Sequence, residues 1–186
     1  MSTLISLNNG SPVVFVQTVA SPSISGTSQQ SLISTGIGSV LIPQKTLIVG
    51  STYRFSMEGA VENPHVAPDG FKIEIGFLGT SPASLAGATG LQYLSGPFAT
   101  ISYQLQGSFT VNAVGAAGLA AISSSAVLTI IDDNAGLALN QIGISVANNA
   151  TFNTTVDNTF EITGGFTAVS ATNRINSRTF VLEKIK

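Results

Sequence analysis

Apolar and polar residues alternate one by one along two stretches of this chain. From Tyr53 to Gly59 (YRFSMEG) and from Phe71 to Phe77 (FKIEIGF), every second residue is apolar or glycine. Successive side chains of a β-strand point to opposite faces of its sheet, so this period of two predicts strands with one buried and one exposed face.

Short apolar runs separated by Gly, Ser, Asn and Pro predict further strands in the rest of the chain. They cover residues 13–19, 32–33, 40–42, 45–49, 101–111, 119–131, 137–146, 156–163, 166–171 and 179–185. No segment keeps apolar residues at helical spacing over several turns. We therefore predict an all-β fold, an antiparallel two-sheet sandwich that is jelly-roll-like (TNF-like) and carries an N-terminal arm.

Glycine and proline mark the expected connections between these strands. The pair Gly164-Gly165 allows the positive φ angles of a tight hairpin turn, and Gly107 predicts a bulge within a long strand. Residues 62–70, which include two prolines, and residues 79–96, rich in Gly, Ala and Ser, are expected to be loops. The second loop has room for one short element near residues 91–94.

Charged residues are scarce in this chain, so the outward faces of the expected strands need not all be exposed to water. Asp, Glu, Lys and Arg make up 9% of the 186 residues, against roughly 25% in an ordinary soluble domain. Small neutral residues replace them, and such a surface suits a protein that packs against copies of itself or against a larger assembly. The length of 186 residues fits one domain, or one domain with an N-terminal arm.

Several classes of partner are disfavoured by the same composition. The net charge of −2 is scattered, and without a basic patch we expect no nucleic-acid binding. There is no cysteine, so disulfides and thiolate metal sites are excluded. No apolar run approaches the length of a membrane span, and the N-terminus lacks the pattern of a secretory signal, so we expect no membrane insertion.

Residues that could carry chemistry are few. His65 is the one histidine and stands between two prolines without a nucleophile motif, so an exposed loop residue is favoured over a catalytic one. Asp132-Asp133-Asn134 could begin a calcium site, but the ligand spacing of such a site is missing and a turn is favoured. We expect no catalytic residue, no metal and no cofactor.

The glutamates are the other candidates for catalysis, as the carboxylate pair of a glycoside hydrolase. Paired carboxylates of this kind would be drawn from Glu58, Glu62, Glu74 and Glu161. Each is better explained as the outward residue of an alternating strand.

The strand from Leu119 to Leu128 has no charge on either face, which is typical of a strand covered on both sides. In a chain without helices the cover must come from another subunit, and stacking about a threefold axis is the simplest solution. The alternative is a monomer with a neutral polar face. The expected trimer-interface residues are Ile101, Tyr103, Ala121, Ser123, Ser125 and Val127.

Three segments are similar to a known family. The run from Ile42 to Gly59 (IPQKTLIVGSTYRFSMEG) resembles a block that opens a trimeric jelly-roll domain in virion proteins of tailed phages and large DNA viruses. The run FKIEIGFLG at residues 71–79 looks like the next strand of that family, and residues 168–185 resemble its closing segment. The resemblance covers about residues 40–186 and consists of structural motifs. It implies an N-terminal arm over residues 1–38 and a jelly-roll β-sandwich domain over residues 39–186.

What the resemblance implies is a non-enzymatic virion structural protein, a trimeric knob that decorates a capsid, vertex, fibre or tail. Its implied partners are two sister copies and other virion proteins, reached through the N-terminal arm. The main alternative is a carbohydrate- or receptor-binding head of a viral fibre, which would bind a host surface glycan or receptor through its loops. A polysaccharide-degrading enzyme and a cellular TNF-like or C1q-like ligand are less favoured.

Overall fold

The computed structural model shows two antiparallel sheets that pack face to face as a β-sandwich, and this confirms the predicted all-β, jelly-roll-like fold. It describes residues 5–6, 12–44, 46–63, 70–78, 83–93, 98–131, 140–146, 152–170 and 172–186. In these ranges every regular element is a strand. The strands are β1 (Ile5–Ser6), β2 (Pro12–Gln17), β3 (Gln30–Ser31), β4 (Gly36–Gly38), β5 (Leu41–Ile42), β6 (Thr52–Asn63), β7 (Gly70–Leu78), β8 (Ala83–Tyr93), β9 (Phe98–Ala113), β10 (Ala121–Ile131), β11 (Asn140–Val146), β12 (Asn158–Phe166) and β13 (Arg174–Lys184).

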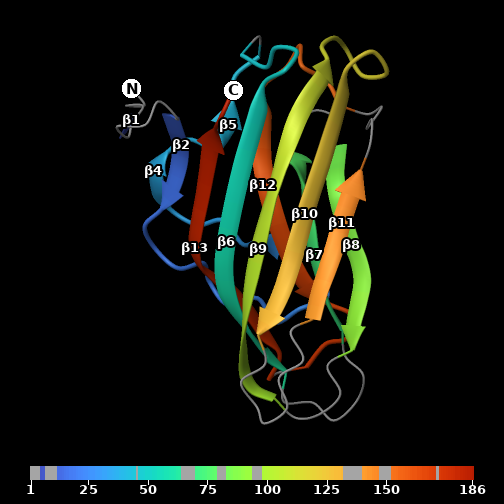
Figure 1. Cartoon of the computed structure of the whole chain (residues 1–186). Helices are drawn as coiled ribbons and strands as arrows, with labels where there is room; N and C mark the ends of the chain where they lie inside the picture. Colours follow the sequence, from blue (N-terminus) through green and yellow to red (C-terminus); the bar gives the residue numbers. More distant parts are fainter. Residues whose placement is uncertain are drawn as a thin grey trace.

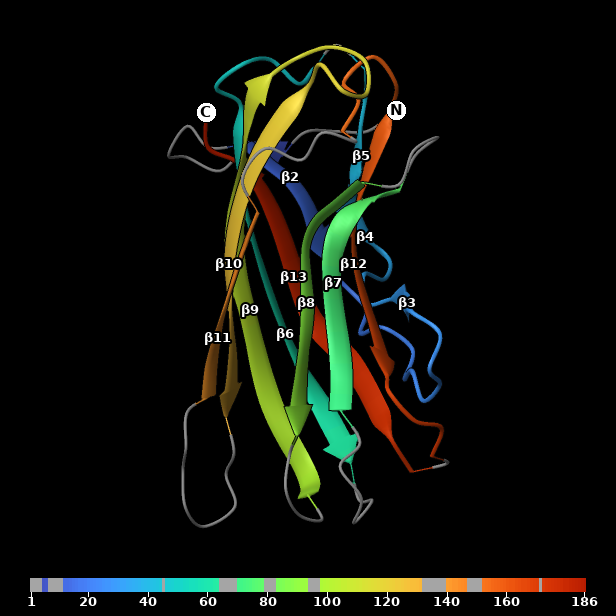
Figure 2. The same ribbon diagram turned by 90° about the vertical axis from the view of Figure 1, so that its right-hand side faces the viewer.

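The larger sheet, sheet A, has the strand order β1-β2-β13-β6-β9-β10-β11, with β4 added beside β2. It faces the viewer in Figure 1. The smaller sheet, sheet B, has the order β3-β12-β7-β8, with β5 added beside β12. Figure 2 shows the two layers from the side, with sheet B to the right of sheet A.

The strand pairs are nested along the chain, which gives the sandwich its jelly-roll character. The outermost pair is β6 with β13, and the next pair is β7 with β12 in the other sheet. Strands β8 and β11 lie against each other without forming a ladder, and β9 and β10 form the innermost hairpin. The chain therefore runs through both sheets as one long, folded ribbon of antiparallel pairs.

Aromatic residues fill the space between the sheets. On β6 the expected alternation is confirmed, because Tyr53, Phe55 and Met57 are buried while Arg54 and Glu58 are exposed. The inward side chains of β7 alternate in the same way. The period-two patterns therefore located the core correctly on both strands.

The N-terminal segment is part of the sandwich, so the predicted boundary between an arm and a domain at residues 38 and 39 is wrong. Strand β2 lies between β13 and β4 in sheet A, and Ile24 pairs with Ile175 of β13. Leu32 is fully buried in the core. Residues 12–38 supply strands and core side chains, and they are not free to act as a separate arm.

Buried side-chain hydrogen bonds hold this segment in place. The amide Nε2 of Gln17 donates to Ser177 Oγ at 2.9 Å, and the backbone N–H of Ser177 donates to Ser21 Oγ at 2.9 Å. The Ser177 hydroxyl also donates to the carbonyl of Leu32. Polar side chains that looked like those of a loop are therefore partners of the central strand β13.

Two predictions about glycines are corrected by the structure. Gly164-Gly165 is not a hairpin turn but lies inside β12, where a Cβ on Gly164 would come within 2.9 Å of the Leu32 side chain. Gly107 is not a bulge, because the register of β9 with both neighbours is continuous there. Both glycines make room for a neighbouring side chain, which for Gly107 is Phe55.

Two predictions about loops and strands are also corrected. The expected loop over residues 79–96 contains β8, and the part of residues 45–49 that the structure describes, 46–49, is loop and turn instead of strand.

Gly59 offers a direct test of how closely the strands of sheet A pack. A Cβ at Gly59 would overlap the backbone carbonyl of Asn176 and come within 2.5 Å of the Tyr103 ring. We expect Gly59→Ala to lower the free energy of unfolding by about 1–3 kcal/mol, because backbone must move to admit the methyl group. Urea denaturation would measure the loss.

The matched control is Gly143→Ala on β11, where nothing lies within 4 Å of the added Cβ. Its stability should equal that of the native chain or exceed it slightly, because alanine reduces the freedom of the unfolded state. Equal stability of the Gly59 and Gly143 variants would contradict the packing described here.

Candidate interaction face

The outer face of β10 carries four of the six residues predicted for a subunit interface. Ala121, Ser123, Ser125 and Val127 alternate with buried residues and point away from sheet B. The inward residues of the same strand are Ile122, Ser124, Ala126, Leu128 and Ile130. The structure therefore gathers these four side chains on one surface, as the alternation predicts.

The other two predicted residues belong to the protomer's own core. Ile101 and Tyr103 on β9 are each 1% exposed and point toward sheet B. The Tyr103 hydroxyl donates to the carbonyl of Asn176 at 3.1 Å, and burial raises the pKa of this side chain. Because one chain already covers them, they are removed from the predicted interface.

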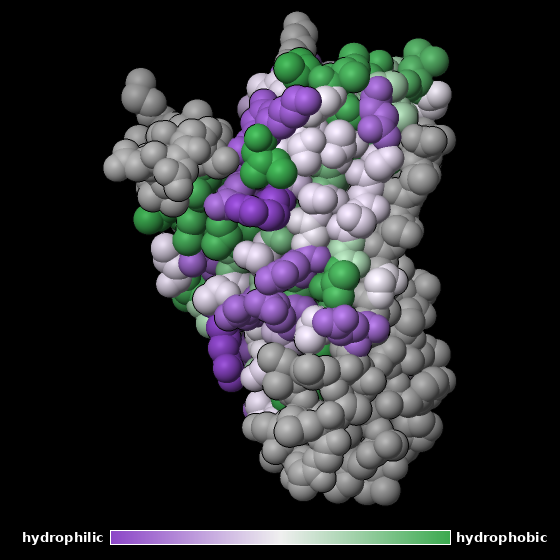
Figure 3. All heavy atoms as spheres, in the orientation of Figure 1, coloured by the Kyte–Doolittle hydropathy of each residue, from purple (hydrophilic) through white to green (hydrophobic). Residues whose placement is uncertain are grey.

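One half of the outer face of sheet A has no charge. Strands β9, β10 and β11 contain no Asp, Glu, Lys or Arg at all. Their outward residues on β9 and β10 are Ser102, Gln104, Gln106, Ser108, Thr110, Ala121, Ser123, Ser125, Val127 and Thr129. The middle of this face is pale in Figure 3, the colour of weakly polar residues.

The other half, on β6 and β13, carries outward charged residues, and each lies next to a residue of opposite charge on the neighbouring strand. Arg54 is the ladder partner of Glu183, and Glu62 is the ladder partner of Arg174. Glu58 and Arg178 line the same small pocket of about 200 Å³. Each outward positive side chain thus has a negative one as a neighbour on the adjacent strand.

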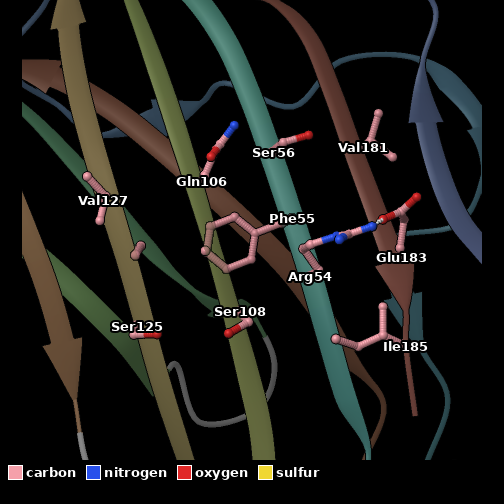
Figure 4. Close-up of a pocket in the computed structure, with 12 residues that line it drawn as sticks. Arg54, Phe55, Ser56, Gln106, Ser108, Ser125, Val127, Val181, Glu183 and Ile185 are labelled. Atoms are coloured by element: carbon pink, nitrogen blue, oxygen red, sulfur yellow. Dashed lines mark hydrogen bonds and ion pairs between the residues drawn. The ribbon is translucent and has the colours of Figure 1, made fainter.

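A shallow groove lies where the two halves meet. It has a volume of about 730 Å³ and crosses β10, β9, β6 and β13. Figure 4 shows its walls: Val127 and Ser125 on one side, and Val181, Glu183 and Ile185 on the other. Gly107 lines the groove between them with its backbone, because its missing side chain would point to the core side, toward Phe55.

The Arg54–Glu183 ion pair borders this groove. Arg54 Nε and Nη2 both donate to Glu183 Oε2, at 2.9 and 2.5 Å. The Arg54 side chain is 61% exposed, so in the single chain water screens the pair, and its contribution to stability is at most about 1 kcal/mol. If another protein surface covered the ion pair, water would no longer screen it and its contribution to stability would change.

In sheet B, Glu161 of β12 is a buried carboxylate, only 8% exposed. One of its oxygens, Oε1, has no hydrogen-bond partner. Burial raises the pKa of Glu161, and this outweighs the hydrogen bonds from Ser31 and the backbone of Ile162, which lower it. The folded state therefore binds a proton at Glu161 more tightly than the unfolded chain does.

We expect the Glu161 site to stabilise the fold at low pH and to lose that contribution as pH rises through its raised pKa. Glu161→Gln should therefore be more stable than the native chain at pH 7, by about 1 kcal/mol. Thermal unfolding of both chains from pH 4 to pH 8 measures the difference, which should grow with pH. The control is Glu74→Gln, on the neighbouring strand of the same sheet.

The four glutamates that could form a hydrolytic pair are divided between the two sheets. Glu58 and Glu62 lie on β6 in sheet A, whereas Glu74 and Glu161 lie on β7 and β12 in sheet B. Among the described residues no group of three or more His, Asp or Glu side chains could hold a metal ion. His65 and the Asp132-Asp133-Asn134 cluster lie outside the described residues.

The alternation of residues along single strands predicts some of the residues that line this groove but not the others. The alternation of β6 could have identified Arg54 as outward, but nothing local pairs it with Glu183, which stands 129 positions further along the chain. Val181, Ile185 and Gly107 were missed for the same reason.

In the described ranges no helix has the length and hydropathy needed to cross a membrane. The sequence matches no protein-family model and no curated protein. The function of this surface must therefore be inferred from its own chemistry.

Proposed function

We propose that this chain is a non-enzymatic structural subunit of a virion, a knob made of three identical jelly-roll-like sandwiches. Its role is mechanical: neutral sheet surfaces of sister copies join into one stable body that attaches to other virion proteins. It decorates a capsid, vertex, fibre or tail.

The single observation that carries this proposal is the electrical neutrality of an uncovered sheet. Soluble domains commonly place charged residues on roughly a quarter to a third of their surface. Here β9, β10 and β11 have none, and each outward arginine of β6 and β13 has a glutamate as a neighbour on the adjacent strand. Such a face is easily dehydrated, because few ions must lose their water when another neutral surface covers it.

The family resemblance supports the virion assignment. The segment from Ile42 to Gly59 forms the end of β5 and the first part of β6, and residues 71–79 contain most of β7. Residues 168–185 contain β13. The similar segments therefore build the paired strands β6 and β13 and their neighbour β7 in the opposite sheet.

Light scattering on the purified chain tests the proposal first. We expect a particle of three times the 19.0 kDa mass of one chain. A stable monomer at micromolar concentration would refute the assembly. Electron microscopy of particles decorated with an antibody to this chain would then show its position, and the absence of label from purified particles would refute the virion role.

The groove supports a second candidate, a glycan-binding head. Gln106, three serines and the Arg54–Glu183 pair line a hollow of about 730 Å³, and hydroxyl and amide groups of this kind can bind sugar hydroxyls. A glycan array separates the candidates. Binding that is lost in Gln106→Ala while the assembled mass is unchanged would favour recognition over a purely structural role.

A further inference from the structure

We propose that the neutral face, meaning the outward residues of β6, β9, β10 and β13 around the groove, is the surface against which a second copy of this chain packs. The inference rests on the proposed function and assigns its contact surface. Four observations carry it: the charges on the face, its size, the shape of the groove and the position of the ion pair.

The charge pattern of the neutral face selects a neutral occupant. Arg54, Arg174 and Arg178 each have a glutamate on the adjacent strand, so the face has no unmatched cation for a phosphate backbone or an anionic lipid. A second copy has the same lack of net charge on its own strands. In a threefold assembly each copy presents part of this sheet to its neighbour, and each arginine that the contact covers has a glutamate on the next strand.

The size of sheet A is sufficient for a stable contact. The four strands of the neutral face, β13, β6, β9 and β10, are adjacent, and β11 extends the same sheet by a fifth strand. With a strand spacing of about 4.8 Å and about ten residues of about 3.3 Å each, their outer face measures about 24 by 33 Å. That area is close to the 800 Å² or so that each partner buries in a typical stable interface.

The shape of the groove favours close approach. Ser56, Ser108 and Ser125 line the groove with short side chains, beside the longer side chains of Arg54 and Gln106. Val127 is 41% exposed and Ile185 is 43% exposed, so apolar side chains rim the groove on both sides. A side chain or backbone of a second copy can enter it and remove these apolar atoms from water.

The Arg54–Glu183 pair supplies polar atoms that can form hydrogen bonds across the contact. Arg54 uses Nε and Nη2 on one carboxylate oxygen, Glu183 Oε2. The guanidinium Nη1 and the second carboxylate oxygen are left to meet polar groups of the incoming copy. A covered ion pair restricts the orientation of the partner, because a shifted copy would leave these groups without hydrogen bonds.

The experiment places a lysine in the groove and measures the assembled mass. Ser125→Lys and Val127→Lys change outward residues that tolerate a charge in the single chain, since both are exposed. We expect each to raise the dissociation constant of the assembly about a hundredfold or more and to yield a folded monomer of 19.0 kDa. The matched control is Ser23→Lys, an exposed serine outside the sheets, which should assemble normally.

The outcomes separate this inference from the proposed function. If the native chain is monomeric, the proposed function and the inference both fail. If the native chain assembles and both lysine variants assemble equally well, the neutral face is not the contact and only the inference fails. If the lysine variants alone are monomeric, with circular dichroism like that of the native chain, both proposals are supported.

A second measurement applies if the lysine variants fail to fold. Because the chain has no cysteine, Ser125→Cys and Ser23→Cys each introduce a unique thiol. A short thiol-specific cross-linker should join copies through position 125 and not through position 23. Cross-linking at position 23 alone would overturn the assignment of the face.

Discussion

A chain that begins at residue 39 is expected to lose its cooperative unfolding transition. Deletion of residues 1–38 removes β2 from its place beside β13 and takes Phe15, Ile24 and Leu32 out of the core. It also removes Gln17 and Ser21, the buried hydrogen-bond partners of Ser177. The loss of a strand, three apolar side chains and two buried polar partners exceeds the usual stability of a domain, 5–15 kcal/mol.

Circular dichroism and a urea titration of the 39–186 fragment would test this expectation. A cooperative transition like that of the full chain would restore the idea of a separable arm. Two point variants give a milder version of the test. Leu32→Ala should cost about 2–5 kcal/mol because Leu32 is fully buried, whereas Ile37→Ala should cost less than about 1 kcal/mol because Ile37 is 51% exposed.

Replacement of Phe160 by alanine is expected to lower the free energy of unfolding by about 3–5 kcal/mol. Phe160 on sheet B is fully buried, and its ring lies 5.2 Å from Phe55, 5.5 Å from Phe109 and 6.0 Å from Phe180, measured between ring centroids. These three rings belong to sheet A. The Phe160 ring therefore links the two layers, and its removal leaves a cavity between them that they can close only in part.

Urea denaturation at a fixed protein concentration measures this loss, since association would make the midpoint depend on concentration. The control is Val169→Ala, at a side chain that is 79% exposed, where the change should stay within about 0.5 kcal/mol. A Phe160 variant as stable as the Val169 variant would mean that the aromatic cluster does not hold the sheets together.

The fold class was predictable because its signal is local. The alternation from Tyr53 to Gly59 and from Phe71 to Phe77 shows which face of each strand packs on the core. This pattern involves only residues that are close together in the sequence. The glycine pair at 164–165 shows the limit of local patterns. A glycine that allows a turn and a glycine that makes room for Leu32 look the same, because Leu32 comes from a distant part of the chain.

The N-terminal boundary was missed for a related reason. Residues 18–35 have the composition of a loop and much of their backbone is irregular. Hydrogen bonds of Ser177 with Ser21 and Leu32, the Ile24–Ile175 bridge and the burial of Leu32 hold them in place. The adjacent Gln17–Ser177 bond spans 160 positions of sequence. Composition describes a segment by itself and carries no information about such partners.

The candidate interface was predictable in part. Alternation alone places Ser125 and Val127 on the face of β10 opposite Leu128. The prediction fails at Ile101 and Tyr103, because both share the phase of Leu105 and Phe109 on β9 and so belong to the core. The groove was not predictable, since it depends on how four strands from separate parts of the chain lie side by side.

Strand β13 lies in the interior of sheet A, between β2 and β6, although it is the last strand of the described chain. During synthesis β2 and β6 therefore emerge from the ribosome long before the strand that joins them exists. Their long-range pairing makes folding slow compared with that of a helical domain of similar size. Until residue 184 is available, unpaired strand edges attract other nascent chains, so a chaperone that shields them would raise the yield of folded protein.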